Sequence, residues 1–184
     1  MLPGILEQAR TFLKEVIPEG GTAVDATAGN GYDTLFLTGC TGPEGKVYSF
    51  DIQQQAVDNT AFRLKNAGAE AEIIVSGHEH ALHYIQEEVI DAAVFNLGYL
   101  PGSDKTVTTT PDTTIMALEG LLKRLKKGGR IVLAVYHGHT EGKVEKDRLL
   151  AFSEALSQKK FQVLQYQFIN QKNSPPFLLI IEKK

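Results

Sequence analysis

Short apolar runs alternate with longer amphipathic stretches along most of the chain. Short runs rich in β-branched and aromatic residues predict buried strands, whereas apolar residues spaced three or four apart predict helices. The expected strands are 22–26, 46–51, 71–75, 91–96, 130–136, 161–168 and 177–182. The expected helices are 32–39, 53–67, 78–87, 111–125 and 142–158, preceded by an amphipathic helix over 3–17.

The order of these elements predicts an α/β fold with a mostly parallel sheet, because strands separated by helices form right-handed crossovers. Residues 170–176, between the last two strands, are too few for a crossover helix, so those strands should pair antiparallel. The predicted sheet has seven strands, one of them antiparallel. A standard dinucleotide-binding fold has six parallel strands instead. The 184 residues are expected to form a single domain, with residues 1–20 packed on it as an N-terminal helix.

A small-residue turn follows the first strand and opens a helix. The turn is Ala28-Gly29-Asn30-Gly31, and Asp33 and Thr34 stand in the first turn of the helix. The second strand ends in Asp51, 26 positions after Asp25 at the end of the first. A strand, a glycine turn and an acid one βα unit later predict a nucleotide-cofactor site, in which the acid accepts the ribose hydroxyls. Alternatively, Asp51 caps the next helix.

The glycine spacing favours a cofactor without phosphates. The third glycine of the dinucleotide fingerprint would fall at Thr34, so S-adenosylmethionine fits better than a pyrophosphate. Its carboxylate would suit the positive end of the following helix. The residues expected to contact it are Asp25, Ala26, Thr27, Ala28, Gly29, Asn30, Gly31, Asp33, Thr34, Asp51, Ile52, Gln53, Gly77, His78 and Asn96.

The turn after the third strand offers two interpretations. Gly77 and His78 would lie beside the adenine. Ser76 and Glu79 have the spacing of a capping box, which would give them a structural role at the start of the next helix.

Asn96-Leu97-Gly98-Tyr99-Leu100-Pro101 follows the fourth strand. This segment resembles the N-P-P-Y motif of enzymes that methylate nucleic-acid amino groups, except that Leu97 and Gly98 replace both prolines. By that resemblance, Asn96 and the Leu97 carbonyl accept hydrogen bonds from the target nitrogen, and Tyr99 stacks on the base. Alternatively, Asn96 is a turn residue.

Tyr136-His137-Gly138-His139 follows the fifth strand, where the side chains could recognise a substrate or accept a proton. They could instead fill a polar loop. A zinc or iron site is also conceivable from residue types alone. It would use His78, His80, His137 and His139, with Glu79 and Glu141 nearby. No specific metal spacing occurs, so no metal is expected.

The composition limits the possible chemistry, the compartment and the partners of the protein. One cysteine, Cys40, excludes an internal disulfide and a cysteine-based zinc site. The chain shows no signal-peptide pattern and no membrane-spanning run, so we expect a cytoplasmic protein. The net charge of −3 argues against a large nucleic-acid footprint on one subunit. Positive charge is local, within 123–127, 143–148 and 159–160.

Taken together, the motifs resemble the bacterial rRNA methylase family of class I S-adenosylmethionine-dependent methyltransferases. The resemblance covers nearly the whole chain, and its carriers are 25–31, 50–53, 96–101 and 136–142. It implies a Rossmann-like three-layer α/β/α sandwich with strand order 3-2-1-4-5-7-6 and strand 7 antiparallel. The family includes the enzyme that methylates 5-aminomethyl-2-thiouridine at the tRNA wobble position.

The resemblance therefore implies methyl transfer to that primary amine, giving 5-methylaminomethyl-2-thiouridine. Asn96, Tyr99, His137 and His139 would act in catalysis, and the partner would be the tRNA anticodon stem-loop. The residues expected at the substrate are Leu97, Gly98, Tyr99, Lys105, Tyr136 and His139.

Three alternatives stay open at this point: an rRNA substrate, a small-molecule amine, and a non-catalytic nucleoside- or RNA-binding module. A homodimer would assemble a wider basic surface than one chain offers.

Overall fold

The computed structural model describes residues 1–98, 109–138 and 140–184, apart from the side chain of Glu141. The strands are β1 Thr22–Asp25, β2 Lys46–Asp51, β3 Glu72–Val75, β4 Ile90–Leu97, β5 Leu125–Val135, β6 Phe161–Tyr166 and β7 Phe177–Lys183. The helices are α1 Ile5–Lys14, α2 Tyr32–Thr41, α3 Gln54–Ala67, the 3₁₀ helix η1 His78–His83, α4 Pro111–Arg124 and α5 Thr140–Glu154.

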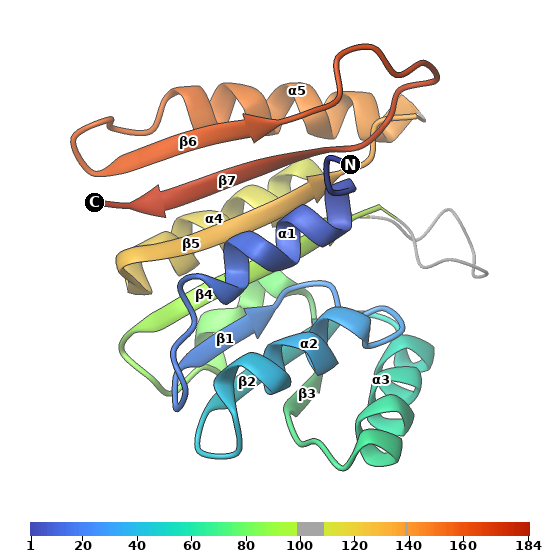
Figure 1. Ribbon diagram of the computed structural model, residues 1–184, viewed down its shortest axis with the longest axis vertical. Helices are drawn as coiled ribbons and strands as arrows, with labels where there is room; N and C mark the ends of the chain where they lie inside the picture. The colour runs from blue at the N-terminus through green and yellow to red at the C-terminus, as the bar shows by residue number, and fades with distance from the viewer. Residues whose placement is uncertain (99–108, 139) are drawn as a thin grey trace.

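All seven strands form one sheet in the order β3-β2-β1-β4-β5-β7-β6 (Figure 1). Strand β7 is antiparallel to both β5 and β6, and the other pairs are parallel. The strand order predicted through the family resemblance is therefore confirmed. The chain reverses its direction of winding between β1 and β4, and ligands of open α/β sheets bind at such a switch point.

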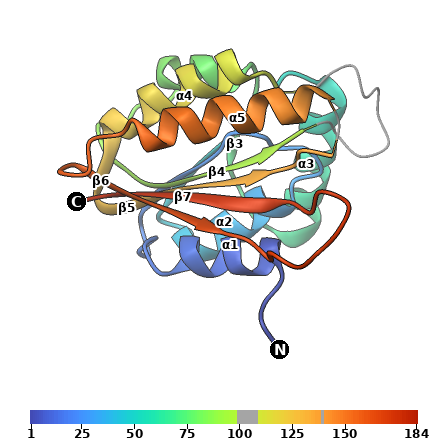
Figure 2. The same cartoon turned by 90° about the horizontal axis from the view of Figure 1, so that it is seen from above.

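Helices cover both faces of the sheet. Figure 2 shows α4 and α5 on one face, with α1 and α2 on the other. Successive strand residues point to opposite faces, so Val24 packs in the core under α4 and α5, and Ala23 packs in the core with α1 and α2. Ile5, Ala9 and Leu13 anchor α1 to its face of the sheet. No helix among the described residues is long and apolar enough to span a bilayer.

The helix predicted over 78–87 is shorter than the pattern suggested. It is a six-residue 3₁₀ helix that ends at His83, and Arg124 on α4 donates hydrogen bonds to the carbonyls of Ile85 and Glu87 in the segment that follows. The predicted capping box is also wrong. Gly77 is the N-cap, and no side chain caps this helix.

Strand β5 begins earlier than the predicted residue 130. Leu125 already pairs with Ile90, and the register then shifts before Ala92 pairs with Arg130. Residues 126–129 contain Gly128-Gly129, which is typical of a turn, and Gly128 does have a positive φ of 73°. The pairing with β4 nevertheless carries the strand through this irregular stretch.

Candidate functional site

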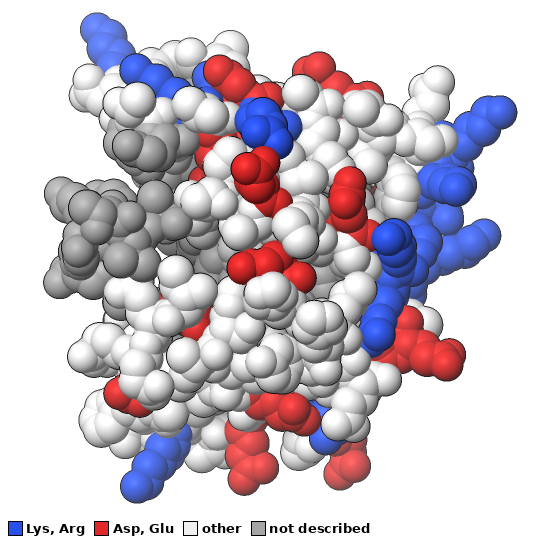
Figure 3. All heavy atoms as spheres, turned by 180° about the vertical axis from the view of Figure 1, so that it is seen from behind, with Lys and Arg blue, Asp and Glu red and all other residues white. Residues whose placement is uncertain are grey.

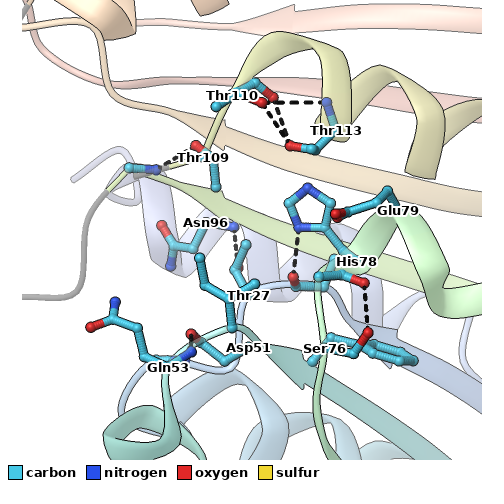
Figure 4. A pocket seen from close by; sticks show the side chains of 16 residues that line it. Thr27, Asp51, Gln53, Ser76, His78, Glu79, Asn96, Thr109, Thr110 and Thr113 are labelled. Carbon is cyan, nitrogen blue, oxygen red and sulfur yellow. Dashed lines mark hydrogen bonds between the residues drawn. The ribbon is translucent and has the colours of Figure 1, made fainter. Parts of the chain in front are cut away.

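The carboxyl ends of β1 to β4 and the start of α4 surround a pocket at one edge of the sheet (Figure 4). The residues that line it are Ala26, Thr27, Gly29, Phe50, Asp51, Ile52, Gln53, Ser76, Gly77, His78, Glu79, Asn96, Gly98, Thr109, Thr110 and Thr113. The structure thus brings together at one pocket predicted residues from the ends of four separate strands.

The turn between β1 and α2 depends on Gly31. Its φ is +76°, and a Cβ at this position would lie 2.8 Å from the Cα of Thr60 on α3. Glycine is therefore needed for both conformation and space. No side chain caps the N-terminus of α2, so its backbone N–H groups and positive dipole end suit an anionic group of a ligand.

Asp25 and Thr34 lie beneath this turn. Asp25 is 1% exposed, accepts a hydrogen bond from the Thr27 amide at 3.1 Å, and accepts another from Thr34 Oγ1 at 2.7 Å. Asp25 and Thr34 do not line the pocket. The same is true of Ala28, Asn30 and Gly31. Of the residues predicted after β1, these five shape the turn, whereas Ala26, Thr27 and Gly29 face the pocket.

Burial raises the pKa of the Asp25 carboxyl from 3.8 to about 7, and the nearby charge of Asp33 adds to this effect. The folded state therefore holds this proton at pH values where the unfolded state has lost it. The contribution of Asp25 to stability is full below about pH 4 and is lost as pH rises to about 7.

We expect Asp25→Asn to remove this part of the pH dependence. The difference in unfolding free energy between pH 4 and pH 7, measured with urea, should be smaller in the variant than in the wild type. The same difference in both proteins would mean that Asp25 titrates normally in the folded state.

Asp51, at the end of β2, is held by two backbone amides. Its Oδ2 accepts from Gly29 and its Oδ1 from Gln53, each at 3.0 Å. The N-cap of α3 is Gln53, so the alternative role of Asp51 as the helix cap is not observed. Each carboxylate oxygen retains acceptor capacity, so Asp51 can accept further hydrogen bonds from hydroxyl groups in the pocket.

His78 lines the pocket but is 7% exposed. Its Nδ1 lies 3.0 Å from the carbonyl oxygen of Ala26. Because that oxygen can only accept, Nδ1 carries the proton and Nε2 is an acceptor. Nε2 is buried without a hydrogen-bond partner among the described residues. Burial lowers the pKa of His78, which keeps the ring neutral.

Asn96 is held in one orientation at the end of β4. Its backbone amide donates to Thr27 Oγ1 at 2.7 Å, and its side-chain Nδ2 donates to Asp33 Oδ2 at 3.1 Å. Arg10 on α1 donates to the other oxygen of Asp33, also at 3.1 Å. With Nδ2 bound to Asp33, Asn96 Oδ1 is the acceptor that remains without a partner among the described residues.

Asp33 does not line the pocket, although the sequence predicted a cofactor contact for it. We expect Asp33→Ala to lower kcat for methyl transfer about tenfold, because the Asn96 amide loses the partner that orients it. The Kd for S-adenosylmethionine should change less than threefold. Calorimetry and initial rates separate the two roles, since a cofactor contact would weaken binding as much as it slows the reaction.

The residues after β5 lie outside the pocket wall. His137 Nε2 is 2.9 Å from the carbonyl oxygen of Pro175, which fixes the proton on Nε2 and leaves Nδ1 as the acceptor. Burial and the charge of Asp33 raise the pKa of Tyr136, so this phenol stays protonated. The predictions for Tyr99, Lys105 and His139 concern positions outside the described residues.

Thr109, Thr110 and Thr113 were not predicted from the sequence. Thr110 is the N-cap of α4, and its side chain accepts a hydrogen bond from the Thr113 amide. Pro111 follows at the first position of the helix. A signal for them existed, because the helix after β4 must start at the same edge of the sheet as the other turns. As for metals, the described residues contain no group of three or more His, Cys, Asp or Glu side chains placed to hold an ion.

The pocket combines the Gly29 turn that leads to the uncapped N-terminus of α2, a carboxylate suited to hydroxyl groups and a wall that includes the buried rings of Phe50 and His78. These groups fit the carboxylate, ribose and adenine of S-adenosylmethionine. The fold and the pocket together define a class I methyltransferase.

Comparisons with known proteins identify the family within that class. Residues 47–182 match the family model described as "Putative rRNA methylase", and the chain belongs to this family. The chain is 33% identical, over 97% of its length and 69% of the relative's, to a protein of Arabidopsis thaliana named tRNA (mnm(5)s(2)U34)-methyltransferase, chloroplastic.

The solved structures that resemble the whole chain include two that the chain covers over their full length. One is a "putative rRNA-methylase" from Clostridium thermocellum, with 41% identity and a TM-score of 0.98. The other is a "putative methyltransferase" from Streptococcus mutans in complex with SAH, with 42% identity and a TM-score of 0.92. The second agrees with S-adenosylmethionine as the cofactor of this chain.

Proposed function

We propose that the protein transfers a methyl group from S-adenosylmethionine to the primary amine of 5-aminomethyl-2-thiouridine at the tRNA wobble position, giving 5-methylaminomethyl-2-thiouridine. The observation that carries the reaction type is the Asn96 amide, whose Oδ1 is left as an acceptor at the pocket. The name of the Arabidopsis thaliana relative supports the choice of nucleoside.

Asn96 and Leu97 act on the amine. A primary alkylamine is mostly protonated near neutral pH and must lose a proton before its lone pair can attack. Asn96 Oδ1 and the Leu97 carbonyl oxygen accept its remaining N–H groups and direct the lone pair into the pocket. Bound S-adenosylmethionine supplies the methyl group and its own leaving group, so positioning provides much of the rate.

Among the residues that the structure describes, His137 is the candidate proton acceptor. Its Nδ1 carries the lone pair because Nε2 is bound to the Pro175 carbonyl oxygen. A neutral imidazole can take the proton directly or through water. His139 remains a second candidate from the sequence.

Basic side chains near the pocket are expected to contact the anticodon stem-loop. Figure 3 shows Lys and Arg gathered on the right of the view, where the parallel strands begin, which is the edge opposite the pocket. The clusters at 123–127 and 159–160 precede the starts of β5 and β6 or overlap them, so they belong to that far edge. The cluster at 143–148 lies in the first half of α5 and is the better candidate for RNA contact.

The description of the family also favours rRNA as a second candidate substrate. A transfer assay with labelled S-adenosylmethionine separates the candidates. It uses tRNA that lacks the wobble methyl group, ribosomal RNA, and small primary amines, with calorimetry to measure binding of the donor. Label in the tRNA alone supports the proposal. Label only in ribosomal RNA, or only in a small amine, would identify that molecule as the substrate instead. If the protein failed to bind the donor, the interpretation of the pocket would be wrong.

A further inference from the structure

The backbone after Asn96 lacks the restraint that the N-P-P-Y motif provides. A proline holds φ near about −65°, whereas glycine has the greatest backbone freedom. Here the prolines are replaced by Leu97 and Gly98, and Gly98 has a φ of +143°, which proline cannot adopt. The Leu97 carbonyl, which the proposed function places at the amine, therefore needs a restraint from elsewhere in the fold.

Thr109 supplies that restraint. Its Oγ1 accepts the Gly98 N–H at 3.1 Å, and its own amide donates to the Gly98 carbonyl oxygen at 3.2 Å. The Gly98 N–H and the Leu97 carbonyl belong to one planar trans peptide and point in opposite directions. A hydrogen bond that fixes the N–H therefore also fixes the direction of the Leu97 carbonyl.

Glu145 in turn fixes the Thr109 hydroxyl. Thr109 Oγ1 donates its single proton to Glu145 Oε2 at 2.9 Å, so a lone pair of the hydroxyl is turned to Gly98. Glu145 is 3% exposed on α5, and its Oε1 accepts from Thr114 Oγ1 on α4, also at 2.9 Å. A buried carboxylate is costly unless its oxygens are hydrogen-bonded, and here both are.

We propose that Glu145 is a positioning residue for methyl transfer, acting through the Thr109 hydroxyl on the Leu97–Gly98 peptide. This inference rests on the proposed function, because that function places the Leu97 carbonyl at the amine. Glu145 and Thr109 replace the rigidity that two prolines give the related motif. The backbone at Gly98 can therefore adopt a φ that proline forbids, and the two hydrogen bonds with Thr109 still hold it in one conformation.

Thr109→Val removes the hydroxyl and keeps the shape of the side chain. We expect it to lower kcat at saturating donor and tRNA about tenfold, and Thr109→Ser to restore most of the rate. Glu145→Gln should lower kcat several-fold. In the double variant, kcat should equal that of Thr109→Val alone, because Glu145 acts through Thr109. Losses that multiply in the double variant would overturn the inference.

A second measurement does not depend on the substrate. The hydrogen exchange rate of the Gly98 amide, measured by NMR, should rise in Thr109→Val and in Glu145→Gln. Thr114→Val is the matched control, since it removes the other hydroxyl bond to Glu145 and should affect Gly98 less. An unchanged Gly98 rate in Glu145→Gln contradicts the inference, whereas a wild type that fails to methylate tRNA contradicts the proposed function instead.

Discussion

Replacing Asn96 with alanine is expected to lower kcat for methyl transfer about 100- to 1000-fold. The variant loses the Oδ1 acceptor that we propose holds the amine, while the backbone amide of residue 96 keeps its hydrogen bond to Thr27. The fold of the pocket should therefore survive, and the Kd for S-adenosylmethionine should change less than threefold. Single-turnover rates at saturating donor, with calorimetry on the same preparation, measure both quantities.

Asn66→Ala is a suitable control for this experiment, because Asn66 is an exposed amide on α3, away from Asn96. It should match the wild type in both rate and donor affinity. If Asn96→Ala weakened donor binding as strongly as it slowed transfer, Asn96 would be a cofactor contact and its assigned role at the amine would be wrong.

Asp51→Ala should give the opposite pattern, with a Kd for S-adenosylmethionine raised about 100-fold and a kcat at saturation close to that of the wild type. Hydrogen bonds to a charged acceptor are stronger than neutral ones, and we expect this carboxylate to accept both ribose hydroxyls of the donor. The substitution also frees the amides of Gly29 and Gln53, which loosens the turn that faces the donor. Calorimetric titration measures the change in Kd.

The matched control is Asp58→Ala on α3, where an exposed carboxylate accepts a hydrogen bond from Gln54. It removes the same charge and should leave donor affinity unchanged. An Asp51→Ala variant with the affinity of the wild type would show that Asp51 only braces the backbone.

The sequence predicted the sheet well because its signal is local. The bounds of β2 agree with the predicted 46–51, and the short link before β7 correctly indicated an antiparallel pair. The errors occur where distant contacts override local pattern. Residues 85–87 lie outside the observed helix and meet Arg124 through the carbonyls of Ile85 and Glu87, and pairing with β4 draws residues 125–129 into β5.

The positions of the candidate site followed from one rule, that ligands bind at the carboxyl ends of parallel strands. That rule placed Asp51, His78 and Asn96 at one pocket, as the structure does. It could not reveal what orients them. Asp33 meets Asn96 across 63 positions of the sequence, and Thr109 meets Glu145 across 36, and neither pair leaves a local signal.

The most direct test of the proposed function uses tRNA that carries 5-aminomethyl-2-thiouridine at the wobble position, incubated with the protein and S-adenosylmethionine. Nucleoside mass spectrometry then follows that one residue, with Asn96→Ala as the inactive control. The proposal predicts that the wild type converts it to 5-methylaminomethyl-2-thiouridine. An unmodified wobble nucleoside, from a protein that binds the donor in the same buffer, would contradict it.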